Sequence, residues 1–424
     1  MTMTVSRKEP LFKSTEIPEL LRASRTSQGG DFANYILKYN GRLNKPLSFE
    51  QGYCLGVFAV YPYYTSLNSN EKLQETFGKD LNIAKIQGTV LLSSMYNTAT
   101  HNVEGASEQL AGIIAAIFDY DIGNSEYGFL NPDAERLTDN CGTGGDTFPT
   151  FHVSTASAFV AAGAGVKVAK HGSPGNAMKS GSSDFITYLN IDSGLNYQPR
   201  AVEETIDGVG FCYIEALDSR YKIVHTQTHS VAHLAHMNDI IGPMTNPTNT
   251  EKLNIKVLGT NNVTPPHVIA DAYRILNKKG ITKVDTALIV KGLVNAERPA
   301  ECMDEVSILE GGTTAAFLHG EGVELIHLDY TDFGLTHPAE PSEVSPPSLN
   351  KKDRLKFTLD TLKRETTEGA VNTVLANTGA VIAMSKGDFN FRDGTEAARV
   401  SLQNGEHWRI IEKVRQRLPL INQE

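Results

Sequence analysis

The segment between Cys141 and Asp184 constrains the fold of this 424-residue chain more than any other part of the sequence. It opens with a glycine-rich turn, passes through small and apolar residues from 154 to 164, and reaches Lys170-His171 before a second turn rich in glycine and serine. Glycine permits positive φ angles and a close approach of the backbone to an anion, and the N-terminus of the following helix adds a partial positive charge. This order of turn, helix, short strand and turn predicts a parallel α/β unit that holds phosphate at the carboxyl ends of its strands.

Short apolar segments alternate with helical patterns through the second part of the chain. Such alternation predicts an α/β fold with a mostly parallel central sheet flanked by helices. Residues 331–348 contain four prolines and are expected to be irregular. The expected strands are residues 166–169, 209–214, 255–258, 286–290 and 315–318, and the expected helices are residues 265–277, 351–365, 369–385 and 394–418.

The first part of the chain has a helical pattern instead. Apolar residues recur at helical spacing in 83–92 and 106–118, and Ser48 with Gln51 three positions later is typical of a capping box at a helix start. Residues 119–140 are rich in Gly, Asn, Asp and Pro, which predicts a linker. The predicted organisation is a polar extension at 1–30, a small all-helical lobe at 31–118 with a contribution from 218–240, and a large α/β lobe at 135–424.

Charge and cysteine content narrow the classes of function. A formal net charge of -10 argues against a nucleic-acid binder that relies on overall basicity. The four cysteines form no CxxC pair, which favours a reduced, intracellular setting. No apolar run approaches the roughly 20 residues that a membrane span requires, and the start of the chain has no apolar signal core. A cytoplasmic protein without membrane association is therefore expected.

Two motifs carry residues that suit phosphate. We call residues 142–155 the first phosphate motif and residues 170–184 the second. The alternative for each glycine-rich turn is an ordinary structural turn, but a basic group, hydroxyls and backbone amides together fit a phosphorylated sugar diphosphate. The candidate contacts are Gly142, Gly144, Gly145, Asp146, Thr150, His152, Ser154 and Thr155 in the first motif and Lys170, Lys179 and Ser182 in the second.

The adjacent carboxylates Asp304 and Glu305 form a third motif. Adjacent carboxylates are commonly an exposed surface pair. Here they follow the expected strand at 286–290 and precede apolar residues, which predicts a position at the ligand-binding edge of the sheet. Hard oxygen ligands at that edge suit Mg²⁺ bound to a diphosphate.

These three motifs, in this order, resemble the anthranilate phosphoribosyltransferase family. The family's GTGGD is unchanged at 142–146, and its metal-binding DE corresponds to Asp304-Glu305. Its NVST, KHGN, SGSAD and LGPLTNP correspond to His152-Val-Ser-Thr155, Lys170-His-Gly-Ser173, Ser180-Gly-Ser-Ser-Asp184 and Ile241-Gly-Pro-Met-Thr-Asn-Pro247.

The resemblance implies a two-lobed homodimer that transfers ribose 5-phosphate from phosphoribosyl diphosphate to an aromatic amine and releases diphosphate. Anthranilate, in tryptophan biosynthesis, is the best single acceptor. By the same resemblance, the two phosphate motifs bind the sugar diphosphate, and Asp304 and Glu305, with Ser154, hold Mg²⁺. No side-chain nucleophile is required, because the metal and Lys170 make diphosphate a good leaving group.

The chain departs from the family where the acceptor binds. An ungapped alignment puts Thr228 or His229 at the arginine that meets the anthranilate carboxylate. Ser173 and Pro174 replace the asparagine and arginine that follow the family's KHG. Arg220 and Lys222 are candidates to supply the missing positive charge. The expected acceptor contacts are His171, Ser173, Arg220, His229 and Gly242.

The same region offers a row of histidines, His225, His229, His233 and His236, spaced by four, four and three residues on one helix face. A polar helix face, acceptor recognition and transition-metal binding all remain open for this row. Three alternatives for function also remain open. They are a paralogue that uses another aromatic amine, an enzyme with a nucleobase-like acceptor resembling the pyrimidine nucleoside phosphorylases, and a non-catalytic relative that binds nucleic acid.

Overall fold

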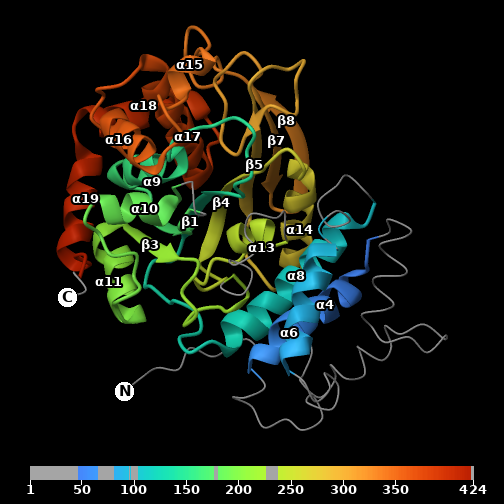
Figure 1. Ribbon diagram of the computed structural model, residues 1–424. Helices are drawn as coiled ribbons and strands as arrows, with labels where there is room; N and C mark the ends of the chain where they lie inside the picture. The colour runs from blue at the N-terminus through green and yellow to red at the C-terminus, as the bar shows by residue number, and fades with distance from the viewer. Residues whose placement is uncertain are drawn as a thin grey trace. The chain divides into compact units, whose positions relative to one another are not determined.

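The computed structural model describes residues 46–64, 81–94, 96, 104–175, 180–225 and 237–421, whose helices and strands are drawn in Figure 1. The chain divides into two compact units. One unit comprises Met1–Asn131, Leu217–Pro247 and Asp271–Thr282, and the other comprises Pro132–Ala216, Thr248–Ala270 and Lys283–Glu424. The chain crosses between the two units several times.

The first unit is built on closely packed helices. These helices are α4 (Phe49–Tyr64), α6 (Leu81–Ser94) and α8 (Ala106–Ala116). Helix α8 continues directly into a π-helix (Ile117–Asp121) and then a 3₁₀-helix (Ile122–Asn124). A Cβ atom on Gly112 would lie 2.1 Å from the carbonyl oxygen of Phe49, so glycine allows α8 to approach α4. The predicted capping box at the start of α4 is confirmed, because the Gln51 N–H donates to Ser48 Oγ and the Ser48 N–H donates to Gln51 Oε1.

The second unit contains an eight-stranded sheet in the order β3-β2-β1-β4-β5-β7-β8, with β6 also paired to β5. Strands β3, β2, β1, β4 and β5 are parallel, whereas β6, β7 and β8 pair antiparallel. The predicted, mostly parallel sheet is therefore confirmed. The strands are β1 (Leu137–Gly142), β2 (Val168–Gly172), β3 (Phe211–Glu215), β4 (Leu253–Gly259), β5 (Thr286–Leu293), β6 (Cys302–Met303), β7 (Thr313–His319) and β8 (Gly322–Leu328).

Helix α9 (Val153–Gly163), which follows the first glycine-rich turn, is buried between the sheet and the C-terminal helices (Figure 1). Its small residues allow this, because a Cβ on Gly163 would lie 2.6 Å from Ser401 Oγ. No helix in the described part of the chain is both long and apolar enough to cross a membrane. The other helices are α10 (Ser182–Tyr188), α11 (Pro199–Val209), α13 (Asn238–Met244), α14 (Pro266–Lys278), α15 (Pro341–Val344), α16 (Lys351–Leu362), α17 (Glu368–Lys386), α18 (Phe391–Gln403) and α19 (Glu406–Arg417).

Several predicted boundaries were wrong. The expected linker at 119–140 contains helical turns and most of β1, a strand near the centre of the sheet. The expected helix at 394–418 is two helices, because Gly405 has a φ of 71° and interrupts it between α18 and α19. Helices α10 and α11 and strand β8 were not predicted, and the irregular segment 331–348 contains the short helix α15.

Candidate active site

The parallel strands bring the ends of distant segments to one edge of the sheet. The first phosphate motif begins at the end of β1, and the second begins on β2, its neighbour in the sheet. The end of β4 and the loop after it contact the first phosphate motif, because the Thr143 N–H donates to the carbonyl oxygen of Gly259 and a Cβ on Gly145 would lie 3.3 Å from Asn261 Nδ2. Asn261 was missed by the sequence analysis, since it follows a strand without any motif.

The glycine-rich turn lies directly against the carboxylate of Asp304. The Gly144 N–H donates to Asp304 Oδ2 at 2.8 Å, and a Cβ on Gly142 would lie 1.9 Å from the same oxygen. Gly144 and Gly145 have φ angles of 66° and 73°, which few other residues adopt. The first phosphate motif is therefore in direct contact with the Asp304-Glu305 motif, although Gly144 and Asp304 are 160 residues apart in the sequence.

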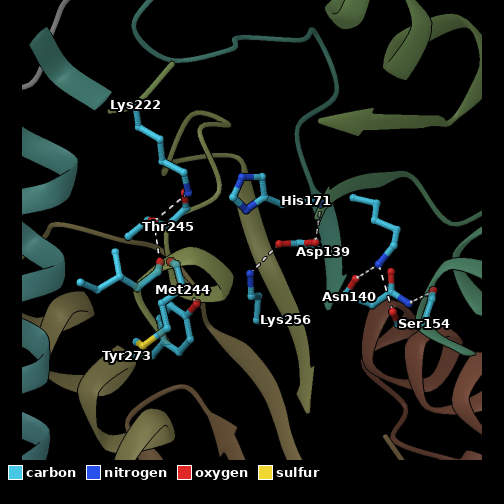
Figure 2. A network of polar contacts seen from close by, with 11 residues as sticks. Asp139, Asn140, Ser154, His171, Lys222, Met244, Thr245, Lys256 and Tyr273 are labelled. Atoms are coloured by element: carbon cyan, nitrogen blue, oxygen red, sulfur yellow. Dashed lines mark hydrogen bonds and ion pairs between the residues drawn. The ribbon is translucent and has the colours of Figure 1, made fainter. Parts of the chain in front are cut away.

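Lys170 places a positive charge at the N-terminus of α9. Its side chain is fully buried, and Nζ donates to the carbonyl oxygen of Asn140 at 2.7 Å and to Ser154 Oγ at 3.3 Å. Asn140 Nδ2 in turn donates to the Ser154 carbonyl oxygen at 2.8 Å, a contact visible in Figure 2. Burial lowers the pKa of Lys170. Buried Thr155 Oγ1 has no hydrogen-bond partner among the described residues, so the start of α9 offers a hydroxyl and a cation to an anion.

A buried ion pair fixes the strands beneath these motifs. Asp139 on β1 and Lys256 on β4 stand opposite each other in the strand register, and Asp139 Oδ2 lies 2.5 Å from Lys256 Nζ (Figure 2). Both side chains are fully buried. Asp139 Oδ1 accepts a hydrogen bond from the His171 N–H at 3.1 Å, which ties β2 to the same carboxylate. The sequence analysis missed this pair, because it assigned Asp139 to a linker.

Glu305 is buried and Asp304 is partly buried, and their carboxyl groups influence each other. Burial raises the pKa of both, and the negative charge of Asp304 raises the pKa of Glu305 further. A hydrogen bond between the two carboxyl groups lowers the pKa of Asp304 and raises that of Glu305. Glu305 Oε2 is buried and has no hydrogen-bond partner in the described structure.

Such a carboxylate pair fits a hard cation. Two adjacent buried carboxyl groups both ionise readily only when a positive charge is close. The described residues contain no group of three or more His, Cys, Asp or Glu side chains that could hold a metal. Two carboxylates suit Mg²⁺, which usually takes its other ligands from water and from substrate phosphates. Asp304 and Glu305 would hold it, and the metal role predicted for Ser154 stays a prediction.

His152 connects the two phosphate motifs. Its Nε2 forms a hydrogen bond of 2.9 Å with Ser180 Oγ, and its ring stacks on Phe185 of α10 with a centroid distance of 5.7 Å. Burial, assisted by the nearby charge of Arg354, lowers the pKa of His152 to about 3. His152 is therefore neutral near pH 7. Arg354 lies on α16, which the sequence analysis did not connect with the site.

The side chains expected to supply positive charge to an acceptor have internal partners. Arg220 Nε and Nη2 donate to the two carboxylate oxygens of Asp218 at 2.8 and 2.6 Å, and Nη1 donates to the Tyr127 hydroxyl at 3.0 Å. Buried Lys222 donates to the carbonyl oxygen and hydroxyl of Thr245, as Figure 2 shows. Asp218 already neutralises Arg220, and this disfavours the acceptor role predicted for the guanidinium.

The other predicted acceptor residues lie in separate local environments. His171 is buried on β2, and the Ser173 carbonyl oxygen accepts a hydrogen bond from the Ser183 N–H at 3.3 Å. Gly242 packs against the imidazole of His225, because a Cβ there would lie 2.5 Å from His225 Cε1. Lys179, Thr228, His229, His233 and His236 lie outside the described residues.

Comparison with known proteins agrees with this arrangement. Residues 134–407, more than half of the chain, match the family described as "Glycosyl transferase family, a/b domain". The chain is 31% identical over 292 residues to an anthranilate phosphoribosyltransferase of Methanothermobacter marburgensis, a match that covers 66% of this chain and 77% of that protein. It is 34% identical over 272 residues to the enzyme of the same name from Halorubrum lacusprofundi, covering 63% and 68% of the two chains.

Solved structures share the fold. The anthranilate phosphoribosyltransferase of Thermus thermophilus has a TM-score of 0.64 at 22% identity and covers 90% of this chain and 98% of its own. The Saccharomyces cerevisiae enzyme, solved in complex with PRPP and Mg, has a TM-score of 0.64 at 19% identity and covers 96% and 98%. Together with the family match and the closer sequence relatives, these findings show that the chain belongs to the anthranilate phosphoribosyltransferase family and is a phosphoribosyltransferase.

Proposed function

We propose that this protein catalyses the Mg²⁺-dependent transfer of ribose 5-phosphate from phosphoribosyl diphosphate to an aromatic amine, and that anthranilate is the acceptor. The observation that carries the proposal is the contact between the glycine-rich turn and Asp304, in which Gly144 N–H donates to Oδ2. This contact joins a phosphate motif to a pair of hard oxygen ligands. The relatives named as anthranilate phosphoribosyltransferases support the choice of acceptor.

The first phosphate motif and Lys170 would bind the donor. Backbone N–H groups of the turn, the hydroxyls of Ser154 and Thr155 and the N-terminus of α9 all suit phosphate oxygens. Lys170 is held at the same helix end by Asn140 and Ser154, so its cation is oriented before substrate arrives. When bound by Asp304 and Glu305, Mg²⁺ would neutralise charge on the diphosphate.

The reaction needs orientation and charge stabilisation rather than a protein nucleophile. The bond between the anomeric carbon and diphosphate breaks, the electron pair leaves with diphosphate, and the amine nitrogen bonds to the anomeric carbon. The amine then loses one proton. Lys170 stabilises the departing negative charge, because a preoriented cation at a buried site acts strongly on developing charge.

The acceptor contacts expected from the sequence, His171, Ser173, Arg220, His229 and Gly242, stay predictions. Ser173 replaces an asparagine of the family, and the position of the family's arginine falls at Thr228 or His229. A changed acceptor site is compatible with anthranilate or with another aromatic amine. The homodimer and the cytoplasmic location stay predictions.

A diphosphate-release assay tests the proposal. Purified protein, phosphoribosyl diphosphate and Mg²⁺ are combined in turn with anthranilate, other aromatic amines and nucleobases. We expect stoichiometric diphosphate release and loss of anthranilate fluorescence, and we expect chelation of Mg²⁺ to abolish both. Turnover of another amine alone would replace anthranilate as acceptor.

The remaining alternatives give different results. A nucleoside phosphorylase would consume inorganic phosphate and a nucleoside and would release no diphosphate. A nucleic-acid-binding relative would bind DNA or RNA with strong salt dependence and would not bind the sugar diphosphate. Either result would contradict the proposal.

A further inference from the structure

Helix α16 contacts both phosphate motifs through one face. Arg354 Nε donates to the carbonyl oxygen of Thr150 at 3.0 Å, and Nη1 donates to the carbonyl oxygen of Ser180 at 3.5 Å. Thr150 belongs to the first phosphate motif and Ser180 to the second. One planar guanidinium thus bridges two segments that are separated by 30 residues in the sequence.

Two neighbours on the same helix face reinforce this bridge. Thr358, four residues after Arg354, accepts a hydrogen bond from the His152 N–H through its hydroxyl at 3.1 Å. Lys351, three residues before Arg354, pairs with Asp184 Oδ1 at 2.5 Å. Spacings of three and four residues put these side chains on one side of a helix.

Asp184, the last residue of the second phosphate motif, contacts both Lys351 and the backbone of that motif. Its Oδ2 accepts hydrogen bonds from the Gly175 N–H at 3.0 Å and from the Gly181 N–H at 2.7 Å. Burial alone raises the pKa of Asp184, but the hydrogen bonds from Lys351, Gly181 and Gly175 outweigh it and lower the pKa. Asp184 is therefore a carboxylate that anchors the two glycines and is held by α16.

Arg354 also brings a positive charge between the two phosphate motifs, at the backbone carbonyl groups of Thr150 and Ser180. Its side chain is partly buried, so water screens this charge less than at an exposed position. A cation so placed is suited to a substrate with several negative charges.

We propose that Arg354 is a positioning residue of the phosphoribosyl diphosphate site, which sets the first and second phosphate motifs at the spacing that binds the diphosphate group. This inference rests on the proposed function and adds to it a residue from outside all the recognised motifs. Lys351 and Thr358 assist Arg354 by fixing Asp184 and His152. Arg354 acts through backbone groups, so its loss should weaken donor binding more than it slows turnover at saturation.

The chain offers a matched control on the same helix. Lys356 is an exposed cation that pairs with Asp360 on α16, and it forms no hydrogen bond or ion pair with either motif in the described structure. Lys356→Met removes one positive charge from α16, as Arg354→Met does. Arg354→Lys retains the charge but cannot reproduce the planar, two-armed contact.

The test is calorimetric titration of inorganic diphosphate and of phosphoribosyl diphosphate, each with and without Mg²⁺, into the full-length wild type and these variants. We expect Arg354→Met to weaken binding of both ligands about 10- to 50-fold, as loss of a charge-assisted contact does. The affinity of Arg354→Lys should lie between that of Arg354→Met and that of the wild type. Lys356→Met should bind like the wild type. In steady-state assays, KM for phosphoribosyl diphosphate should rise at least fivefold more than kcat falls, with the acceptor KM unchanged.

Two results would overturn the inference. One is wild-type affinity in Arg354→Met. The other is an equal loss of ligand affinity in Arg354→Lys and Arg354→Met, together with a matching loss of thermal stability. That result would mean that Arg354 has a purely structural role. If the wild type itself binds neither ligand, the proposed function fails first, and that outcome is distinct because it does not depend on Arg354.

Discussion

The two phosphate motifs and the acceptor segment, residues 218–247, use their charged side chains differently. In the phosphate motifs, buried Lys170 is held at the start of α9, beside hydroxyls that suit an anion. In the acceptor segment, Arg220 and Lys222 are engaged by Asp218 and Thr245. A cation at a helix N-terminus remains able to attract phosphate, whereas a cation paired with a carboxylate has little net charge to offer.

This difference separates the residues that the transfer reaction itself needs from the residues that would select the acceptor. The charges of the phosphate motifs suit any acceptor, since every phosphoribosyl transfer must neutralise diphosphate. In the acceptor segment, the position of the family's arginine is predicted to hold Thr228 or His229. Variants of the phosphate motifs should therefore have large effects on every acceptor, and variants of Arg220 should have small ones.

The largest effect is expected from Lys170→Met. Removal of the preoriented cation should lower kcat/KM for phosphoribosyl diphosphate by about 10²- to 10³-fold. The free energy of unfolding should change little, because the variant loses a hydrogen bond to Asn140 but no longer buries an ammonium group. Steady-state kinetics and urea unfolding measure both. Activity within threefold of the wild type would remove Lys170 from the site.

Gly142→Ala should have the next largest effect. The added Cβ would lie 1.9 Å from Asp304 Oδ2, so the carboxylate or the turn must move. We expect a loss of about 10- to 10²-fold in kcat/KM, since small displacements of oriented groups are costly, and a higher Mg²⁺ requirement. Gly322→Ala on β8 is the control, because its nearest atom would be 3.6 Å away. Equal activity of the two variants would contradict this reading of the turn.

His152→Asn introduces the asparagine of the family's NVST. It should change the pH dependence of the free energy of unfolding more than it changes enzymatic activity. The pKa of His152 is lowered to about 3 in the folded protein, so its neutral form adds stability above the unfolded-state pKa of about 6.5, and that stability is lost as the pH falls toward 3. Between pH 7.5 and 4.5, the wild type should lose about 2–3 kcal/mol more unfolding free energy than the variant.

Urea unfolding at the two pH values measures this difference. Buried His407, whose pKa is lowered to about 4, is common to both proteins and cancels in the comparison. Identical pH dependence in wild type and variant would show that His152 is protonated in the folded protein or exposed to water.

Arg220→Met should have the smallest effect on catalysis. Because Asp218 neutralises the guanidinium, we expect the acceptor KM to change less than about threefold, whereas the free energy of unfolding should fall by about 1–3 kcal/mol as buried Asp218 loses its partner. Kinetics with anthranilate and thermal unfolding test both. A tenfold rise in the acceptor KM would contradict this expectation and support the acceptor role predicted for Arg220.

The sequence was most informative where local chemistry decides structure. The capping box of Ser48 and Gln51 could be predicted because both hydrogen bonds join residues three apart. The glycine-rich turn could be predicted because its φ angles require glycine. The parallel sheet could be predicted because short apolar strands alternate with helices along the sequence.

Strand β1 and helix α16 show what the sequence could not reveal. Strand β1 looked like a linker, since Asp139 and Asn140 are polar, and only the register with Lys256 and the position of Ser154 explain their burial. Arg354 contacts Thr150, 204 residues away. Contacts of this kind depend on tertiary packing and leave no local pattern. The domain boundaries at 31, 118 and 135 stay predictions.

The most direct test of the contrast between the phosphate motifs and the acceptor segment is titration of phosphoribosyl diphosphate, with Mg²⁺ and no acceptor, into the wild type, Lys170→Met and Arg220→Met. We predict saturable binding by the wild type, unchanged affinity in Arg220→Met and at least tenfold weaker binding in Lys170→Met. Absence of binding by the wild type, or equal affinity in Lys170→Met, would contradict the account.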